Sequence, residues 1–284
     1  MIQTGTAVPR MNCAARTSPS FAKMAPLGHR QLSDTGCGAH ALHGQGPCLS
    51  HTMTSTNKAS TEIAPKKASL TLRAQISDMQ GELASDSALR IALSHGLQVS
   101  DLALVLYDSL APLHGLSAPW RERLICAALL HDLGQVFGIR KHHKNTLALL
   151  LEEKAAEDEG TASCTRALVS ILPEKERLAI GLVARYHRKA WPSTLDPLFA
   201  GLSLQERLGV SVCASILRIA DALDVLHTNE VQSLRVIVDD ASVVLELHGA
   251  NGPCATLEEH ALRARMKGEL FMDLFGRELT WRLC

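Results

Sequence analysis

Leucine recurs every four or five positions between residues 89 and 110, which is the spacing of one face of an α-helix. These residues are Leu89, Leu93, Leu97, Leu102, Leu106 and Leu110. Hydrophobic residues make up 46% of the 284-residue chain but aromatic residues only 4%, so the core must be aliphatic. Helices that pack through Leu, Ala, Val and Ile suit this composition. The sequence therefore predicts a mainly α-helical protein.

Helical patterns continue along the chain from residue 66. We expect helices over residues 70–83, 86–113, 120–133, 144–157, 173–187 and 203–227. Pro119 suits the first turn of the third helix, and Gly134 follows its last residue. Pro192 and Pro197 indicate a loop before the long helix over 203–227.

The pattern changes from helical to alternating after residue 230. Apolar residues alternate over 234–238 and 243–247, with a turn over 239–242, which predicts a β-hairpin. A helix over 257–275 and a strand over 278–283 are expected to follow. The expected fold is a helical bundle over residues 66–230 with a small α/β subdomain over 231–284.

Residues 1–65 show no such periodicity. They are rich in Ser, Thr, Gly, Pro and Ala, and Asp34 and Glu62 are their only acids. Such a segment buries too little apolar surface to offset the entropy lost on ordering. Two interpretations remain open: a disordered or transit-peptide-like tail, or a start codon assigned too early, with Met53 as the true N-terminus.

Charge and cysteine content restrict the function further. The 29 basic residues balance 29 acidic ones, which argues against a protein that coats nucleic acid but allows a local basic patch. No uninterrupted apolar run approaches the roughly 18 residues of a membrane span, so no membrane association is expected. The eight cysteines form no C-x-x-C pair, which indicates a reducing, cytoplasmic compartment.

The segment with the most specific chemistry is the end of the helix over 120–133. There an apolar run ends in the adjacent pair His131 and Asp132, followed by Gly134. Imidazole nitrogen and carboxylate oxygen together suit Mn, Fe, Zn, Co or Ni, and also Mg. Taken alone, however, such a pair is common and is more typical of an ordinary helix end. His95, in an otherwise apolar helix, and Asp221, between apolar neighbours, favour a site, because a buried acid needs a cation or hydrogen bonds.

The order His, His-Asp, Asp on separate helices resembles the HD superfamily of metal-dependent phosphohydrolases. Four segments in order, 129–134, 141–146, 184–189 and 216–224, narrow the resemblance to one domain. They look like the C-terminal HD domain of the exopolyphosphatase / guanosine pentaphosphate phosphatase family, and the likeness covers roughly residues 85–283. That family's N-terminal actin-like domains have no counterpart here, and Gln135 stands where many HD proteins have lysine.

The resemblance implies roles for individual residues. It makes His95, His131, Asp132 and Asp221 ligands of a divalent metal ion. Of the adjacent pair His142 and His143, we expect His143 to complete a second metal site or to contact phosphate.

Catalytic and phosphate-binding roles follow from the same resemblance. His187 is expected to act as phosphate ligand, proton donor or further metal ligand, and Arg218 to orient Asp221 or bind phosphate. A basic collar is expected to bind phosphate, although a solvated surface is equally compatible with its residues. The collar comprises Arg140, Lys141, His142, Lys144, Arg185, Arg188 and Lys189.

Two functions remain open. The first is an exopolyphosphatase-like phosphohydrolase that acts on phosphate anhydrides or nucleotides, with a metal ion activating water. The second is a non-catalytic regulatory module that binds polyphosphate or nucleotides. The His-Asp pair and Asp221 favour the first, whereas Gln135 and the missing actin-like domains favour the second. Few aromatic residues lie near the collar, so direct nucleic-acid recognition is not expected, and a homodimer is compatible with the sequence.

Overall fold

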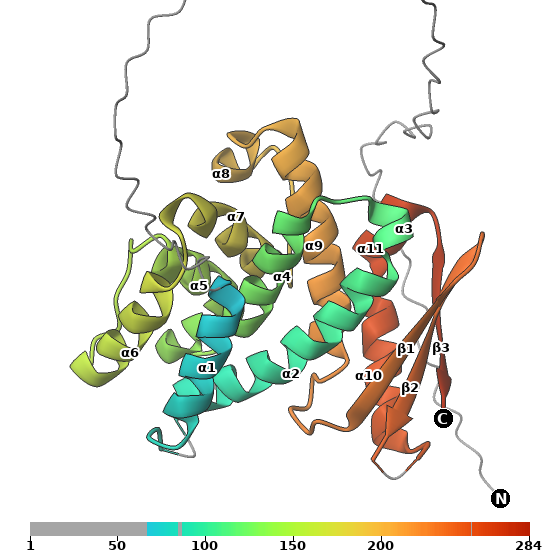
Figure 1. Cartoon of the computed structure of the whole chain (residues 1–284), viewed down its shortest axis with the longest axis horizontal. Helices are drawn as coiled ribbons and strands as arrows, with labels where there is room; N and C mark the ends of the chain where they lie inside the picture. The colour runs from blue at the N-terminus through green and yellow to red at the C-terminus, as the bar shows by residue number, and fades with distance from the viewer. Residues whose placement is uncertain (1–66, 85–86, 251) are drawn as a thin grey trace, which may run out of the picture. The chain divides into compact units, whose positions relative to one another are not determined.

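The computed structural model describes residues 67–84, 87–250 and 252–284, and the segment over 1–65 discussed above lies outside them. The described residues form eleven α-helices, a short 3-10 helix and three strands (Figure 1). This confirms the predicted fold class, a helical bundle with a small α/β segment at its C-terminal end.

Helix α9 (Leu204–Ala222) lies at the centre of the bundle (Figure 1). Around it pack α2 (Ala88–Ser109), α4 (Ala118–Leu130) and α7 (Glu174–Arg185). Twelve of its residues are buried, from Gly209 to Ala222, because apolar side chains occupy nearly every position of its second half. The other helices of the bundle are α1 (Ala68–Gln80), α3 (Ala111–His114), α5 (His142–Leu150), α6 (Glu159–Ser170) and α8 (Pro197–Ala200), with the 3-10 helix η1 over Leu133–Phe137.

Two helices were not expected from the sequence, α6 and the short α8, which lies in the predicted loop before α9. The predicted helix over 144–157 is wrong in its second half. Helix α5 ends at Leu150, and two residues later Glu152 takes a left-handed backbone conformation with φ of 59°. A new helix, α6, begins after Asp158, whose carboxylate accepts a hydrogen bond from the Thr161 amide. The acidic residues between them therefore form a loop rather than a helix end.

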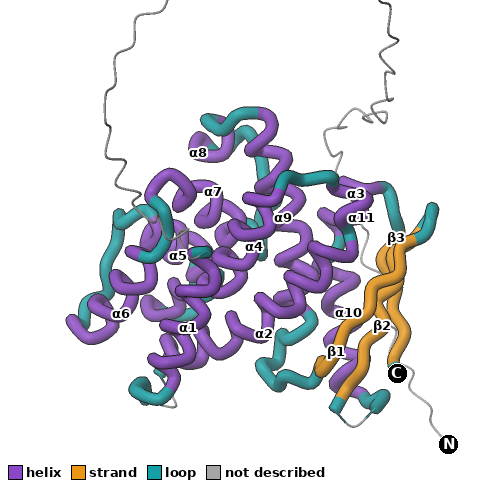
Figure 2. The backbone as a smooth tube through the Cα atoms, in the orientation of Figure 1, coloured by secondary structure: helices purple, strands orange, loops and turns teal. Residues whose placement is uncertain are grey.

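The β-hairpin is confirmed with wider bounds. Strand β1 (Val231–Val238) pairs antiparallel with β2 (Ser242–Gly249), and β3 (Glu278–Leu283) pairs parallel with β2 (Figure 2). Two helices connect β2 to β3: α10 (Ala255–Lys267) and α11 (Glu269–Phe275). The predicted single helix over 257–275 divides at Gly268, where a Cβ atom would lie 2.6 Å from the Leu279 side chain of β3.

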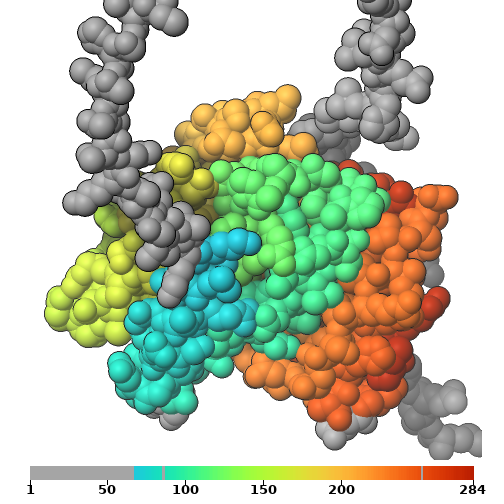
Figure 3. Space-filling model, viewed as in Figure 1, coloured from blue at the N-terminus to red at the C-terminus, as the bar shows by residue number. Residues whose placement is uncertain are grey.

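The C-terminal segment packs directly on the bundle. Helices α10 and α11 contact α9, and β1 contacts α2, against whose surface the strands lie in the space-filling view (Figure 3). One continuous set of buried apolar residues runs from Leu72 to Leu279. The α/β segment therefore completes the core of the helical bundle.

Among the described helices, α2 alone has the length and composition to cross a membrane, with a mean hydropathy of 1.3 over its most apolar window. Of that window, 56% is buried inside the protein, as in the core helix of a bundle.

Candidate metal centre

Helix α4 delivers His131 and Asp132 to the middle of the bundle. The helix ends at Leu130, and both side chains are buried. His131 Nδ1 lies 2.8 Å from the backbone oxygen of Ala128, so this nitrogen carries the proton and Nε2 faces away with its lone pair. One oxygen of Asp132 accepts a hydrogen bond from the side-chain amide of Gln135. Gln135 thus orients a candidate ligand, although it adds no charge.

His95 reaches the same place from α2 and faces the end of α9. Its Nδ1 lies 2.8 Å from Asp224 Oδ2, and its Nε2 lies 3.2 Å from Asp221 Oδ1. Asp224 also accepts a hydrogen bond from the backbone amide of Asn229 at 2.9 Å. In metal sites, a ligating histidine commonly donates its other ring N–H to a carboxylate in this way, which fixes the orientation of the ring.

His142 and His187 form the other side of the centre. His142 begins α5, and His187 follows the last residues of α7. Their Nδ1 atoms lie 3.0 Å and 2.6 Å from the backbone oxygens of Ile139 and Ala184. Their Nε2 atoms lie only 3.3 Å apart, and that of His142 is 2.9 Å from Asp132 Oδ1. Both rings thus present a lone pair to one shared space.

The donor set fits a divalent metal ion. With each Nδ1 protonated, as its hydrogen bond indicates, the Nε2 atoms of His142 and His187 are two acceptors in contact. Only a cation makes such a contact favourable, and donors about 2.1 Å from one ion lie about 3.0 Å apart in octahedral geometry. His131 Nε2 and Asp132 Oδ1 are buried without a hydrogen-bond partner. Two groups of close donors share Asp132: His95, His131 and Asp132, and Asp132, His142 and His187.

The protonation equilibria agree with a ligand role. Burial lowers the pKa of His95, but hydrogen bonds with Asp221 and Asp224 outweigh it and raise the pKa to about 9. Burial lowers the pKa of His187 to about 3, so this ring is neutral at physiological pH. Burial raises the pKa of Asp132 and Asp221, but the neighbouring histidines hold both below the usual range. The centre therefore offers two carboxylates that are ionised at neutral pH.

The structure brings together the four ligands that the resemblance implied: His95, His131, Asp132 and Asp221. At the adjacent pair it places His142 in the centre and leaves His143 beside it. His143 is partly exposed, and its ring centroid lies 5.9 Å from that of His142. Because α5 turns one of two successive residues inward, only the three-dimensional structure distinguishes them.

The catalytic candidates occupy different places. His187, expected to be a phosphate ligand, proton donor or metal ligand, lies among the atoms that could hold a metal ion. Arg218 is buried, and its Nη1 and Nε donate to the backbone oxygens of Tyr186 and Lys267 at 3.0 Å and 3.3 Å. Arg218 thus joins the ends of α7 and α10.

The basic collar is uneven. Its member His142 belongs to the candidate metal-binding residues, and Arg188 lies next to it, with Nη1 3.3 Å from His142 Nε2. Arg185 forms an ion pair with Asp196 at 3.1 Å, which occupies part of its guanidinium group. The remaining cations of the collar are exposed: Arg140, Lys141, Lys144 and Lys189.

Three small residues to which the sequence analysis gave no role in the site allow the centre to form. A Cβ atom on Gly96 would lie 2.4 Å from the backbone oxygen of Leu129, so α2 and α4 approach through this glycine. A Cβ atom on Gly134 would lie 2.3 Å from the backbone of α5. Thr146 Oγ1 accepts from the Gly134 amide and donates to the His131 oxygen, each at 2.9 Å. The only feature of the sequence that could have indicated this role was a glycine close to a candidate ligand.

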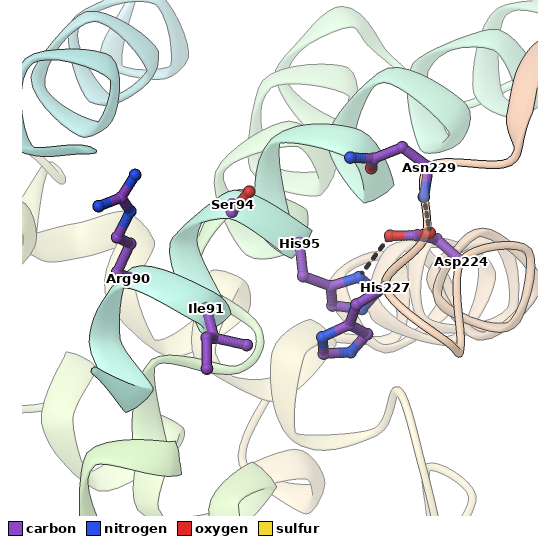
Figure 4. A pocket seen from close by; sticks show the side chains of 7 residues that line it. All are labelled: Arg90, Ile91, Ser94, His95, Asp224, His227 and Asn229. Carbon is purple, nitrogen blue, oxygen red and sulfur yellow. Dashed lines mark hydrogen bonds and ion pairs between the residues drawn. The ribbon is translucent and has the colours of Figure 1, made fainter. Parts of the chain in front are cut away.

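A pocket of about 280 Å³ lies behind His95 (Figure 4). His227 stacks on the His95 ring there, with ring centroids 3.9 Å apart, and the loop that carries it holds Asp224. The other lining residues are Arg90, Ile91, Ser94 and Asn229. The pocket therefore borders Asp224, which orients His95, and one side of the His95 ring. It is lined by these residues rather than by the other candidate ligands.

Comparison with known proteins agrees with this geometry. Residues 92–226 match the family model described as HD domain, a span that contains all six candidate ligands. This part of the chain, 135 of 284 residues, is therefore similar to an HD domain. No curated protein matches the chain.

Proposed function

We propose that the protein is a metal-dependent phosphohydrolase that acts on phosphate anhydrides or nucleotides, in the manner of an exopolyphosphatase. The observation that carries the proposal is the buried set of Nε2 and carboxylate atoms with no hydrogen-bond partner at His131 Nε2 and Asp132 Oδ1. A divalent ion bound there would supply a water of lowered pKa and would neutralise charge on phosphoryl oxygens.

The protein's own residues prepare this chemistry. Backbone oxygens hold the Nδ1 protons of His131, His142 and His187, and Asp224 holds that of His95. The ligands are therefore oriented before an ion or a substrate arrives, which lowers the cost of reorganisation. Arg188 adds a positive charge next to His142, where it can bind a phosphoryl oxygen.

Metal analysis followed by a phosphate-release screen tests the proposal. Freshly purified full-length protein should contain a divalent metal, and stripped protein should be reloaded separately with Mn, Fe, Zn, Co, Ni and Mg. The screen compares polyphosphate, guanosine polyphosphates and nucleotides. Wild-type protein should release phosphate with at least one metal.

Two variants make the result specific. Asp221→Asn removes a ligand charge and should lose most metal and activity, because water would have to complete the ligand set. Glu258→Gln on the surface of α10 is the matched control and should retain both. Bound metal without phosphate release from any compound would reject catalysis and favour the regulatory phosphate-binding module.

A further inference from the structure

The metal centre opens to solvent at Asp221. The side chain of Asp221 is 17% exposed, whereas those of the other five candidate ligands are at most 6% exposed. A substrate phosphate must therefore approach the ions past Asp221. The charges around this opening decide which groups of a substrate are bound next to the reacting phosphate.

Lys267 lies at this opening although it belongs to the C-terminal α/β segment. It is the last residue of α10, and its backbone oxygen accepts the 3.3 Å hydrogen bond from Arg218 Nε, one helical turn before Asp221. Its ammonium group interacts with the charges of Asp221, Arg218, Arg188 and Lys189. It thus shares the opening with two residues of the basic collar.

Arg218 determines where this lysine stands relative to the collar. The guanidinium group bridges the backbone oxygens of Tyr186, at the end of α7, and Lys267, at the end of α10. Arg188 and Lys189 follow the last residue of α7 by three and four positions, so the same bridge sets the position of these two cations relative to Lys267. Because Arg218 uses Nε and Nη1 for this bridge, we assign it a positioning role.

Lys267 has no counter-ion of its own. Within residues 67–84, 87–250 and 252–284, no carboxylate lies within ion-pair distance of its ammonium group, and the residue is partly buried. The negative charge that acts most strongly on it is that of Asp221, and a bound metal ion would neutralise that charge. Placing this cation beside Arg188 and Lys189 costs repulsion that a bound anion removes.

We propose that Lys267 binds a phosphate group next to the one held by the metal ions, together with Arg188 and Lys189. The ligand class is a phosphate anhydride, because these cations lie outside the metal ligands and a monoester offers them no second phosphate. This inference rests on the proposed function of the same site. It also gives the C-terminal α/β segment a direct part in substrate binding.

Binding of methylenediphosphonate, an analogue of pyrophosphate that cannot be hydrolysed, tests the proposal. The titration uses full-length protein loaded with Mn²⁺ and is measured by calorimetry at low and high salt. Lys267→Gln should weaken binding about tenfold at low salt and less at high salt, with unchanged metal content. Lys267→Arg should restore most of the affinity. Arg263→Gln removes one charge from the same helix, where Arg263 pairs with Glu259, and should change nothing.

The outcomes separate this inference from the proposed function. The role of Lys267 would be overturned if Lys267→Gln bound methylenediphosphonate as tightly as wild type, or if wild type did not bind it. Neither result would decide phosphohydrolase activity, which the phosphate-release screen tests. Failure of wild type to release phosphate from any compound would overturn the proposed function instead. A loss of affinity in Lys267→Gln would then still locate a binding site for adjacent phosphates.

Discussion

At the scale of single residues, the proton on Nδ1 determines which histidines can bind a metal ion. His131, His142 and His187 each lie close to the backbone oxygen three residues earlier, so each Nε2 keeps its lone pair. His143 lacks this contact. Its ring is also neutral at neutral pH, because burial lowers its pKa to about 4.

Exchanging these histidines one at a time tests their placement. His187→Gln should lower the metal content and weaken metal affinity by at least about a hundredfold, because a buried ligand is lost. His143→Gln should keep the metal content of wild type, since its ring is partly exposed and outside the close donors. Metal analysis after dialysis against a weak chelator measures both, and loss of metal from His143→Gln alone would refute the placement.

The raised pKa of His95 predicts how the metal-free protein responds to pH. The folded-state pKa of about 9 exceeds the ordinary histidine pKa of 6.5, so the protonated ring stabilises the fold fully below pH 6.5. This contribution, at most about 3 kcal/mol, is lost as the pH rises from 6.5 to 9. Denaturant unfolding of metal-stripped protein at several pH values should therefore give a free energy of unfolding that falls across this range.

Two controls identify the group responsible. Metal-loaded protein should lose this pH dependence, because the ion replaces the proton on Nε2 of His95. His95→Gln, stripped of metal, should show a flatter profile between pH 6.5 and 9. A slope equally steep in both would assign the titration to other groups.

At the scale of secondary-structure elements, the approach of α2 to α4 controls the distance between His95 and His131. A Cβ atom at residue 96 would lie 2.4 Å from the backbone oxygen of Leu129, two residues before His131. Gly96→Ala should destabilise the protein by about 1–3 kcal/mol, because backbone atoms cannot yield as side chains do. It should also weaken metal binding, since the two helices must separate.

The matched substitution is Gly160→Ala in α6. A Cβ atom there meets only a carboxylate oxygen of Asp158 at 3.5 Å, an ordinary contact. Alanine should leave stability unchanged or raise it by up to about 1 kcal/mol through its higher helix propensity. Urea unfolding and metal content of both variants measure the difference, and equal effects would show that helix propensity alone is responsible.

At the scale of the whole molecule, the α/β segment and the bundle share one core, so we expect them to unfold together. Leu257 of α10, Phe271 of α11 and Leu245 of β2 are buried within the same set of apolar residues as Ile216 of α9. Native-state hydrogen exchange should give the slowest amides of α4 and β2 the same opening free energy. A separate, lower value for β1 to β3 would show two independent units.

Much of the fold was predictable from the sequence, because helical and alternating patterns are local properties. The leucine spacing over 89–110 predicted α2, and the alternation over 234–247 predicted the hairpin. Prolines, glycines and charged residues in the sequence indicated where most of the helices begin or end. The break at Leu150 and the start of α6 were missed because they depend on the left-handed Glu152 and on the Asp158 cap.

The candidate site was predictable only where a residue carried a chemical signal of its own. His131, Asp132, His95 and Asp221 were marked by type, order and apolar neighbours, and they meet in the structure as the resemblance implied. Lys267 carried no such signal, and Arg218 was expected from the resemblance to orient Asp221 or bind phosphate. The places of both residues depend on the packing of α10 against α9 and on the Arg218 bridge to the end of α7, which join residues far apart in the chain.

The sequence by itself therefore determined the helical class and the hairpin, and it marked four of the candidate metal ligands, since these depend on residue type and short-range spacing. Only the tertiary structure decided between His142 and His143, placed His187 among the ligands and brought Lys267 to the opening. The physical reason is that ligand geometry and charge proximity are relations between distant segments, set by helix packing through Gly96 and Gly134 and by the Arg218 bridge.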